Sequence, residues 1–369
     1  MLAELHDDEM VCIASSIDPN DLFAFSLTCR RTRLAVARAN GGRGTRTRLD
    51  SVLASKSTSR CVWGVQAGAL SACNWTSIDL AGKEIGSKGA IGLAEGLKVS
   101  ASLSKLDLTD NKVGNKGAIG IGDGLKACVS LSTLCLDGNQ IGDAGAIGLA
   151  EGLKVSASLT TLHLSDNQIG NRGAIGIGNG LKACASLSTL CLDGNQIGDA
   201  GATGLGEGLK ASTSLTMLHL EGNKIGNRGA IGIGDGLKVN ASLGTLLLDD
   251  NQIGDAGAVD LGEALKVNRS LTTLHLEDNK IGNRGAIGIG KGLEVNDQLI
   301  VLNLNGNQIG DPGAIGLTKC FRSYSFWELR LEGNKFSSKG ERVLDKIMRG
   351  NSQDSSHDCD WYDGPWVSI

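Results

Sequence analysis

The chain is poor in proline, in aromatic side chains and in net charge. It has 3 Pro and 3% Phe, Trp and Tyr, and none of these aromatic residues falls between Thr76 and Cys320. Its 36 Lys and Arg nearly balance its 40 Asp and Glu, so the composition does not indicate bulk binding of nucleic acid. No apolar run approaches the ~20 residues that a membrane-spanning helix needs. The acidic start MLAELHDDEM lacks the features of a secretory signal peptide. We expect a cytoplasmic or nuclear protein.

The ten cysteines include no CxxC pair, which disfavours a zinc ribbon or a dithiol redox motif. Cys128 and Cys135 return at equivalent places in a later copy as Cys184 and Cys191, so duplication of the sequence accounts for these four. We therefore predict reduced thiols in an intracellular protein.

Three segments match the acceptor pattern for N-glycosylation, starting at Asn74, Asn240 and Asn268. Because this modification needs a secretory route, we expect the three matches to be accidental.

Glycine and repetition are abundant, with 54 Gly in 369 residues. The stretch LDGNQIGDAGAIGLAEGLKVSASL (136–159) returns with few changes at 192–215, and looser copies stand between and around these two. Aligned on LxLxxN, the Asn recurs at one constant spacing from Asn111 to Asn307, and the spacing shortens by a single position at Asn334. Ten units of this kind indicate a repeat protein in which neighbouring units share one core.

Each unit predicts one strand and one turn. In TLHLSDN (161–167), Leu162 and Leu164 alternate with polar residues, which is typical of a strand with one buried face. Asn167 then turns the chain, and we expect its amide to satisfy backbone groups that the bend leaves without partners.

The second half of each unit predicts a helix, because Ala146, Leu149 and Leu153 have helical spacing and Lys154 suits the helix C-terminus. The residue three positions before the Ala of this pattern is always Ser, Asn or Asp. We therefore predict that each of these residues caps its own helix. The row comprises Ser87, Asn115, Asp143, Asn171, Asp199, Asn227, Asp255, Asn283 and Asp311.

The pattern LxLxxNxIGxxGAxxLxxxLKxxxSL, as in Leu162 through Leu187, resembles the leucine-rich repeats of the ribonuclease inhibitor type, which also occur in Ran GTPase-activating proteins and NOD-like receptors. The resemblance implies an α/β solenoid of horseshoe shape, with parallel strands on the concave face and helices on the convex face. It implies little about function, because the fold has many unrelated partners.

Glycine-rich helices such as GAIGIGDGLK (117–126) superficially resemble nucleotide-binding loops. They lack GxxxxGK[ST] and lie inside the helix rather than before it. We therefore interpret them as sites of close helix packing between units.

The middle strand residues alternate between Cys and His, as in Cys135, His163, Cys191 and His219. Such residues are zinc ligands, but a straight ladder at about 4.8 Å spacing does not converge tetrahedrally. We predict no metal site and no cofactor.

An acidic edge follows the strands, whereas the Lys row lies at the far ends of the helices. We predict a polar, salt-sensitive site for a basic protein partner here, although exposed charge that keeps a solenoid soluble is the alternative. The proposed contact residues are Asp137, Asp193, Glu221, Asp249, Asp250, Glu277 and Asp278.

The N-terminal stretch LHDDEMVCIASSIDPNDLFAFSLTCRRTRLA (5–35) resembles an F-box. This resemblance implies docking on a Skp-family adaptor of a cullin-RING ubiquitin ligase, with the repeats holding the target. The matching residues that we assign to the adaptor contact are Leu5, Ile13, Pro19, Leu22 and Leu27.

We predict four parts of the chain: an F-box-like helical segment (1–38), a flexible basic linker (39–60), the capped solenoid (61–348) and a disordered acidic tail (349–369). The protein is expected to bind proteins without catalysis, as a ubiquitin-ligase substrate receptor. A scaffold or recognition protein without a ubiquitin role is the alternative, and a Ran-type GTPase-activating protein is a weaker one, since no catalytic residue stands out from the repeat.

Overall fold

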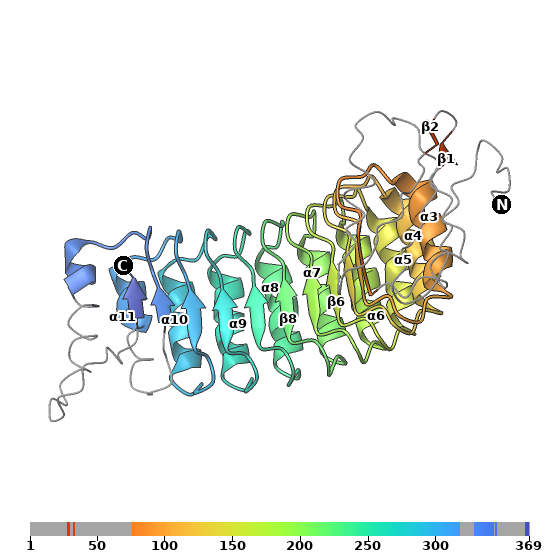
Figure 1. Ribbon diagram of the computed structural model, residues 1–369. Coiled ribbons are helices and arrows are strands. Elements are labelled where there is room, and N and C mark those ends of the chain that lie inside the picture. The colour runs from red at the N-terminus through yellow and green to blue at the C-terminus, as the bar shows by residue number, and fades with distance from the viewer. Residues whose placement is uncertain are drawn as a thin grey trace, which may run out of the picture. The chain divides into compact units, whose positions relative to one another are not determined.

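The computed structural model describes residues 76–317, 328–342 and 344, together with short strands at 28–29, 32–33 and 366–368. The chain divides into two compact units, Met1–Asn167 and Gln168–Ile369, and both contain the same alternation of strand and helix. Within each unit, consecutive strands lie side by side in one layer and the helices form a second layer beside it (Figure 1). The predicted α/β solenoid is confirmed.

In the first unit, adjacent repeat strands pair in parallel and in sequence order. The strands are β3 (Ser77–Asp79), β4 (Lys105–Asp107), β5 (Thr133–Cys135) and β6 (Thr161–His163), and the helices are α3 (Gly86–Leu97), α4 (Gly114–Leu125) and α5 (Asp143–Leu153).

In the second unit the same parallel order continues from strand to strand. Its repeat strands are β7 (Thr189–Cys191), β8 (Met217–His219), β9 (Thr245–Leu247), β10 (Thr273–His275), β11 (Val301–Asn303) and β12 (Glu328–Arg330). Its helices are α6 (Asn171–Leu181), α7 (Asp199–Leu209), α8 (Asn227–Leu237), α9 (Asp255–Leu265), α10 (Asn283–Leu293) and α11 (Asp311–Leu317).

Two further pairings involve the ends of the chain. Within the segment expected to be helical at 1–38, β1 (Thr28–Cys29) and β2 (Thr32–Arg33) pair in antiparallel fashion, so these four residues are not helical. Within the tail 349–369, β13 (Trp366–Ser368) pairs in parallel with β12. The other residues of both segments, and the linker 39–60, lie outside the described part of the chain.

The core is built from one set of apolar side chains per repeat. In the repeat of β8 and α8, Leu218, Leu220, Ile225, Ala230 and Ile233 are all fully buried. Full burial of a Leu or Ile side chain stabilises by about 1.5–3 kcal/mol. A three-residue strand or an 11-residue helix is too short to be stable alone, so the shared core holds both.

The buried asparagine after each strand joins two repeats. The Nδ2 group of Asn251 donates to the carbonyl groups of Leu248 and Asp249 in its own repeat, at 3.1 and 3.0 Å, and to Leu220 of the preceding repeat at 2.9 Å. Its Oδ1 accepts the backbone N–H of Ile225 in the preceding repeat at 2.9 Å. The predicted role in the bend is confirmed, and the amide also fastens the neighbouring repeat.

The prediction that the Asn/Asp row caps its own helices is wrong. Asn227 is the first residue of α8, after Gly226 in extended conformation, and α8 has no side-chain cap. The Oδ1 atom of Asn227 instead accepts the N–H groups of Gly254 and Gly257, at 2.9 and 2.8 Å, where α9 begins. Asp199 does the same for the start of α8. A residue at the first helical position cannot readily reach back to its own helix start, whereas the neighbouring helix start lies within reach.

The glycine-rich helices pack as predicted. A Cβ atom on Gly236 of α8 would lie 2.6 Å from the carbonyl oxygen of Gly206 in α7, well inside van der Waals contact. Interior glycine costs about 1 kcal/mol in helix propensity relative to alanine. The close approach of adjacent helices explains why alanine cannot take its place.

We predict that Asn227→Ala lowers the free energy of unfolding by about 1 kcal/mol, the usual effect of losing a cap. Because the cap acts on α9, hydrogen exchange measured by mass spectrometry should accelerate at Gly254 and Gly257 rather than at the start of α8. The exposed Lys224→Ala is the control. Equal melting of both variants, or faster exchange confined to α8, would contradict the capping between repeats.

Candidate functional site on the sheet face

The sheet face of the second unit carries two rows of polar or reactive side chains that are candidates for binding. The parallel register places the third residues of successive strands side by side. A second row follows two positions later along each repeat. The first row is Cys191, His219, Leu247, His275, Asn303 and Arg330, and the second is Asp193, Glu221, Asp249, Glu277, Asn305 and Glu332. Four of the predicted acidic residues, Asp193, Glu221, Asp249 and Glu277, thus share one edge, with His and Cys beside them.

Asp250 and Asp278 have a conformational role in addition to their charge. Their backbone φ values are 51° and 49°, in the left-handed region that Gly, Asn and Asp tolerate best. The equivalent positions in the two preceding repeats are Gly194 and Gly222, with φ of 63° and 62°. The backbone therefore requires Gly or a residue such as Asp, and the carboxylates that it admits are exposed.

We predict that Asp250→Gly leaves the free energy of unfolding nearly unchanged, whereas Asp250→Leu lowers it by about 1–2 kcal/mol, because the left-handed conformation penalises a bulky side chain. Urea titration followed by circular dichroism would measure both. Equal stability of the two variants would show that the turn does not select the residue type.

The inner acidic residues are held in place by neighbouring repeats. Asp249 Oδ1 accepts the backbone N–H of Glu277 at 2.6 Å, and its Oδ2 lies 3.4 Å from His275 Nδ1. Glu277 Oε2 accepts a hydrogen bond from Asn303 Nδ2 at 2.6 Å. These contacts fix the direction of the carboxylates, which reduces the conformational entropy that a bound partner would otherwise remove.

Glu221 is the exception in this row. Its Oε2 atom is buried and has no hydrogen-bond partner among the described residues. Burial raises the pKa of Glu221, its own backbone and His219 oppose that shift, and the charges of Asp193 and Asp249 add to it. A buried carboxylate oxygen without a partner is costly, so this position marks a point where a positive ligand would stabilise the protein.

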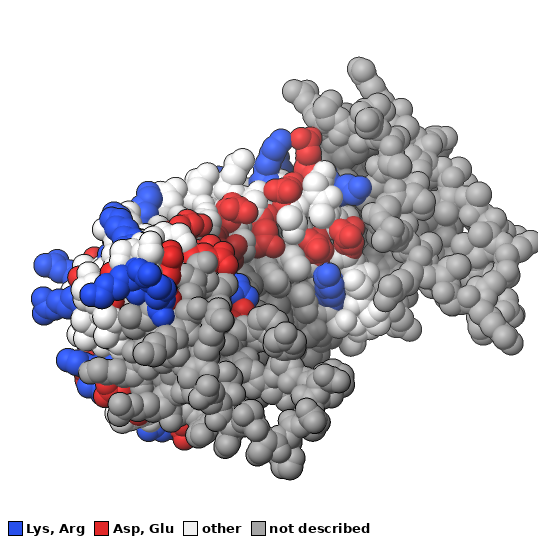
Figure 2. All heavy atoms as spheres, turned by 90° about the vertical axis from the view of Figure 1, so that its left-hand side faces the viewer, with Lys and Arg blue, Asp and Glu red and all other residues white. Residues whose placement is uncertain are grey.

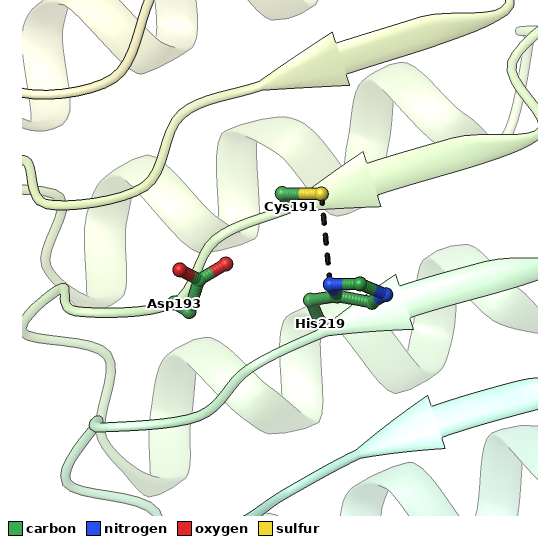
Figure 3. Close-up of side chains that lie close together, drawn as sticks. All are labelled: Cys191, Asp193 and His219. Carbon is green, nitrogen blue, oxygen red and sulfur yellow. Dashed lines mark hydrogen bonds between the residues drawn. The ribbon is translucent and has the colours of Figure 1, made fainter.

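The side chains of Cys191, Asp193 and His219 converge (Figure 3). The Sγ atom of Cys191 lies 3.7 Å from Nδ1 of His219, and one ligand atom of each of the three residues lies within 4.8 Å of the others. A straight Cys/His ladder is expected not to converge tetrahedrally; here the Asp193 carboxylate joins the Cys191–His219 pair from beside the ladder. Sequence reasoning missed the convergence because it placed Cys and His on a ladder without the Asp two positions beyond Cys191.

The corresponding residues in the first unit do not form such a group. Asp137 Oδ1 accepts the backbone N–H of Ser165 at 2.8 Å, and Cys135 and His163 are side by side in the strand register. Burial, together with the charge of Asp107, raises the pKa of the Cys135 thiol to about 11, so this thiol stays protonated at neutral pH.

The helix side is close to neutral rather than basic. In α7, α8 and α9 the Lys at the helix end forms an ion pair with an acidic residue three positions earlier, as in Lys210–Glu207 and Lys266–Glu263, both 2.6 Å. Lys182 after α6 instead donates to Asn179, and Glu294 takes this place after α10. Figure 2 shows acidic side chains gathered over the middle of the face that it draws, with Lys and Arg toward its margins. The predicted separation of charge therefore depends on the acidic edge and not on a basic outer row.

In two of the three glycosylation patterns, the asparagine side chain has a structural role. The side chains of Asn240 and Asn268 are buried, at 5% and 3% exposure. Asn240 donates to the carbonyl groups of Leu209 and Ser212, and Asn268 to the equivalent pair one repeat later. Neither amide is accessible in the folded protein, which gives a physical reason for expecting no glycan there.

The five residues assigned to an adaptor contact, Leu5, Ile13, Pro19, Leu22 and Leu27, lie outside the described residues. Among the helices that the structure describes, none is long and apolar enough to cross a membrane.

Comparison with known families finds eight matches to the family described as "Leucine Rich repeat", which together cover just over half of the chain. They span residues 99–122, 127–150, 155–178, 183–206, 211–234, 239–262, 267–290 and 296–317. No curated protein matches the sequence. Solved structures similar to the chain include "Leiomodin-1 Actin-Binding Site 2 (ABS2)", with 21% identity, a TM-score of 0.27, and coverage of 41% of this chain and 75% of that one.

Proposed function

The chain belongs to the leucine-rich repeat family, and on that premise we propose that it is a non-enzymatic recognition protein whose acidic sheet face binds a basic segment of a partner protein. Leucine-rich repeats indicate a module for protein interaction. The charge and geometry of the second unit support the choice of partner.

The observation that carries this proposal is the group of four carboxylates after β9 and β10, namely Asp249, Asp250, Glu277 and Asp278. Adjacent strands lie about 4.8 Å apart, well within the ~8 Å screening length at physiological salt, so these charges reinforce one another. Within the described residues, Asp250, Glu277 and Asp278 form no ion pair with Lys or Arg. Arg of a partner could bind such carboxylates in bidentate fashion.

Binding at this face should be polar, because no Phe, Tyr or Trp occurs between Thr76 and Cys320. Aromatic side chains supply much of the binding energy in many tight interfaces. Without them, electrostatic attraction acts mainly on the association rate and falls with added salt. This behaviour distinguishes the acidic edge from an apolar docking surface.

We predict that neutralising three carboxylates of the acidic edge with Asp250→Asn, Glu277→Gln and Asp278→Asn weakens binding of an arginine-rich peptide about tenfold at low ionic strength, which corresponds to about 1.4 kcal/mol. Asn tolerates the left-handed backbone, so folding should be retained. Stopped-flow fluorescence with a labelled peptide would show a slower association rate and a weaker dependence on salt.

The matched control is Glu207→Gln, Asp235→Asn and Glu263→Gln, which removes the same charge from helices α7, α8 and α9 of the same unit. These acids pair with Lys210, Lys238 and Lys266. If the control variant loses as much affinity as the edge variant, net charge and not the sheet face explains binding. If the unmutated protein shows no salt-dependent binding, the acidic site is refuted.

We further propose that the N-terminal segment links this recognition face to a ubiquitin ligase, through the F-box-like match at Leu5, Ile13, Pro19, Leu22 and Leu27. The sequence match alone supports this role, and the paired strands β1 and β2 do not fit the helical segment that it implies. In this role the protein would raise the effective concentration of a target beside a ubiquitin-loaded enzyme.

We predict that a Skp-family adaptor co-purifies with the full chain, and that Leu22→Ala with Leu27→Ala abolishes this contact while the repeats keep their helical circular dichroism. The arginine-rich peptide should still bind that variant. No adaptor binding by the intact protein at micromolar concentration would leave a scaffold or recognition protein without a ubiquitin role.

A further inference from the structure

We propose that Cys191, Asp193, His219 and Glu221 form a binding site for one Zn²⁺ ion between β7 and β8. Cys191 Sγ lies 3.7 Å from His219 Nδ1. In a tetrahedral site with Zn–S near 2.3 Å and Zn–N near 2.0–2.1 Å, these two ligands are about 3.6 Å apart. The donor atoms of Cys191, Asp193 and His219 already lie within 4.8 Å of one another, so small side-chain rotations complete the approach.

The four residues come as two equivalent pairs. Cys191 and His219 are register partners on parallel strands, and Asp193 and Glu221 each follow their strand residue by two positions, on the same face of the extended chain. Asp193 points toward the Cys191–His219 contact from the loop after β7 (Figure 3). The structure therefore brings one sulfur, one nitrogen and the carboxylate of Asp193 to one place, and the Glu221 carboxylate follows the neighbouring strand. Zn²⁺ accepts all three ligand types.

Glu221 supplies the second, independent observation. Its Oε2 is buried and has no hydrogen-bond partner among the described residues, although it stands in a row of carboxylates. A divalent cation bound by Cys191, Asp193 and His219 would give this oxygen a partner and would offset the local negative charge. We therefore assign Glu221 as the fourth ligand, which its side chain would become by rotating toward the convergent group of Cys191, Asp193 and His219.

The strand pair that contains Cys191 and His219 can be compared with the copies that lie two repeats before and two repeats after it. The copy that lies two repeats earlier has Cys135, Asp137 and His163, but Ser165 in place of Glu221. The copy that lies two repeats later has Asp249, His275 and Glu277, but Leu247 in place of the Cys. The middle copy alone among these three has all four residues, and three of them, Cys191, Asp193 and His219, form the convergent group found among the described residues.

Bound Zn²⁺ would fasten β7 to β8, and it would add free energy to folding in proportion to its occupancy. The site is separate from the four carboxylates after β9 and β10 that carry the proposed partner face. If the Zn²⁺ site is refuted, the proposal of the partner face is unaffected. If the partner face is refuted, the proposal of the Zn²⁺ site is unaffected.

The test uses the full chain, reduced and freed of metal by a chelator, and titrates Zn²⁺ in competition with a chromophoric indicator. We expect one site per chain, with affinity reduced at least 100-fold in Cys191→Ser and His219→Asn. Glu221→Ser, which reproduces the earlier copy, should weaken binding at least tenfold. Cys135→Ser is the matched control and should bind as the unmutated protein does.

Co²⁺ provides a direct readout of the sulfur ligand. The unmutated protein and Cys135→Ser should show thiolate-to-cobalt charge-transfer absorption, which should be absent in Cys191→Ser. Because six cysteines besides Cys128, Cys135, Cys184 and Cys191 are present, absorption that persists in Cys191→Ser would place the metal on other thiols and overturn the proposal. Absence of Zn²⁺ binding by the unmutated protein would do the same.

Thermal unfolding of the metal-free variants shows whether they fold. If Cys191→Ser does not fold, His219→Asn and Glu221→Ser decide the question. In folded protein, Zn²⁺ should raise the melting temperature of the unmutated chain and of Cys135→Ser but not that of His219→Asn. An equal shift in His219→Asn would exclude this site.

Discussion

The buried asparagine amide after each strand is the interaction on which the repeat depends. In each described repeat from Asn111 to Asn307 this side chain is at most 6% exposed, and it satisfies backbone groups in its own repeat and, as at Asn251, in the preceding one. A buried polar group without a partner costs about 1–3 kcal/mol. The turn could not be buried without the amide, and without a buried turn the strands could not stack at constant register. The rows on the sheet face follow from that register.

The fold could be predicted because every repeat contains the same signals: alternating Leu in the strand, Asn at the turn and helical spacing of Ala and Leu. The predictions that failed concern contacts between neighbouring repeats. Asn227 has the residue type of a cap, but sequence could not show that its side chain serves α9 and not α8. Likewise, spacing places Cys191 beside His219 but does not give the rotation of the side chains, which decides whether they converge.

The acidic edge shows that the sequence alone is equally insufficient for predicting function. A count of Asp and Glu treats all carboxylates alike, but the structure separates them. Asp250 occupies a left-handed turn, and Asp249 orients the next repeat. The Oε2 atom of the half-buried Glu221 is buried and has no hydrogen-bond partner among the described residues. The exposed carboxylates of Asp250 and Asp278 are available to a protein partner, whereas Asp193 belongs to a group whose ligand atoms converge, as a metal ion requires. One acidic row can therefore carry two separate proposals, because its members differ in environment rather than in residue type.

The capping between helices also explains why each repeat matches the second repeat along the chain more closely than the next one. The first residue of α7 is the carboxylate Asp199, and the side chain that caps this helix from the preceding repeat is the neutral Asn171. The first residue of α8 is the neutral Asn227, and the side chain that caps this helix is Asp199. Each of these helix starts has one carboxylate, which favours the positive end of the helix dipole without placing two like charges together. Loss or gain of a single repeat would put two carboxylates at one helix start, or none. The heritable unit of this array is thus the pair of repeats, and its length should change during evolution in even steps.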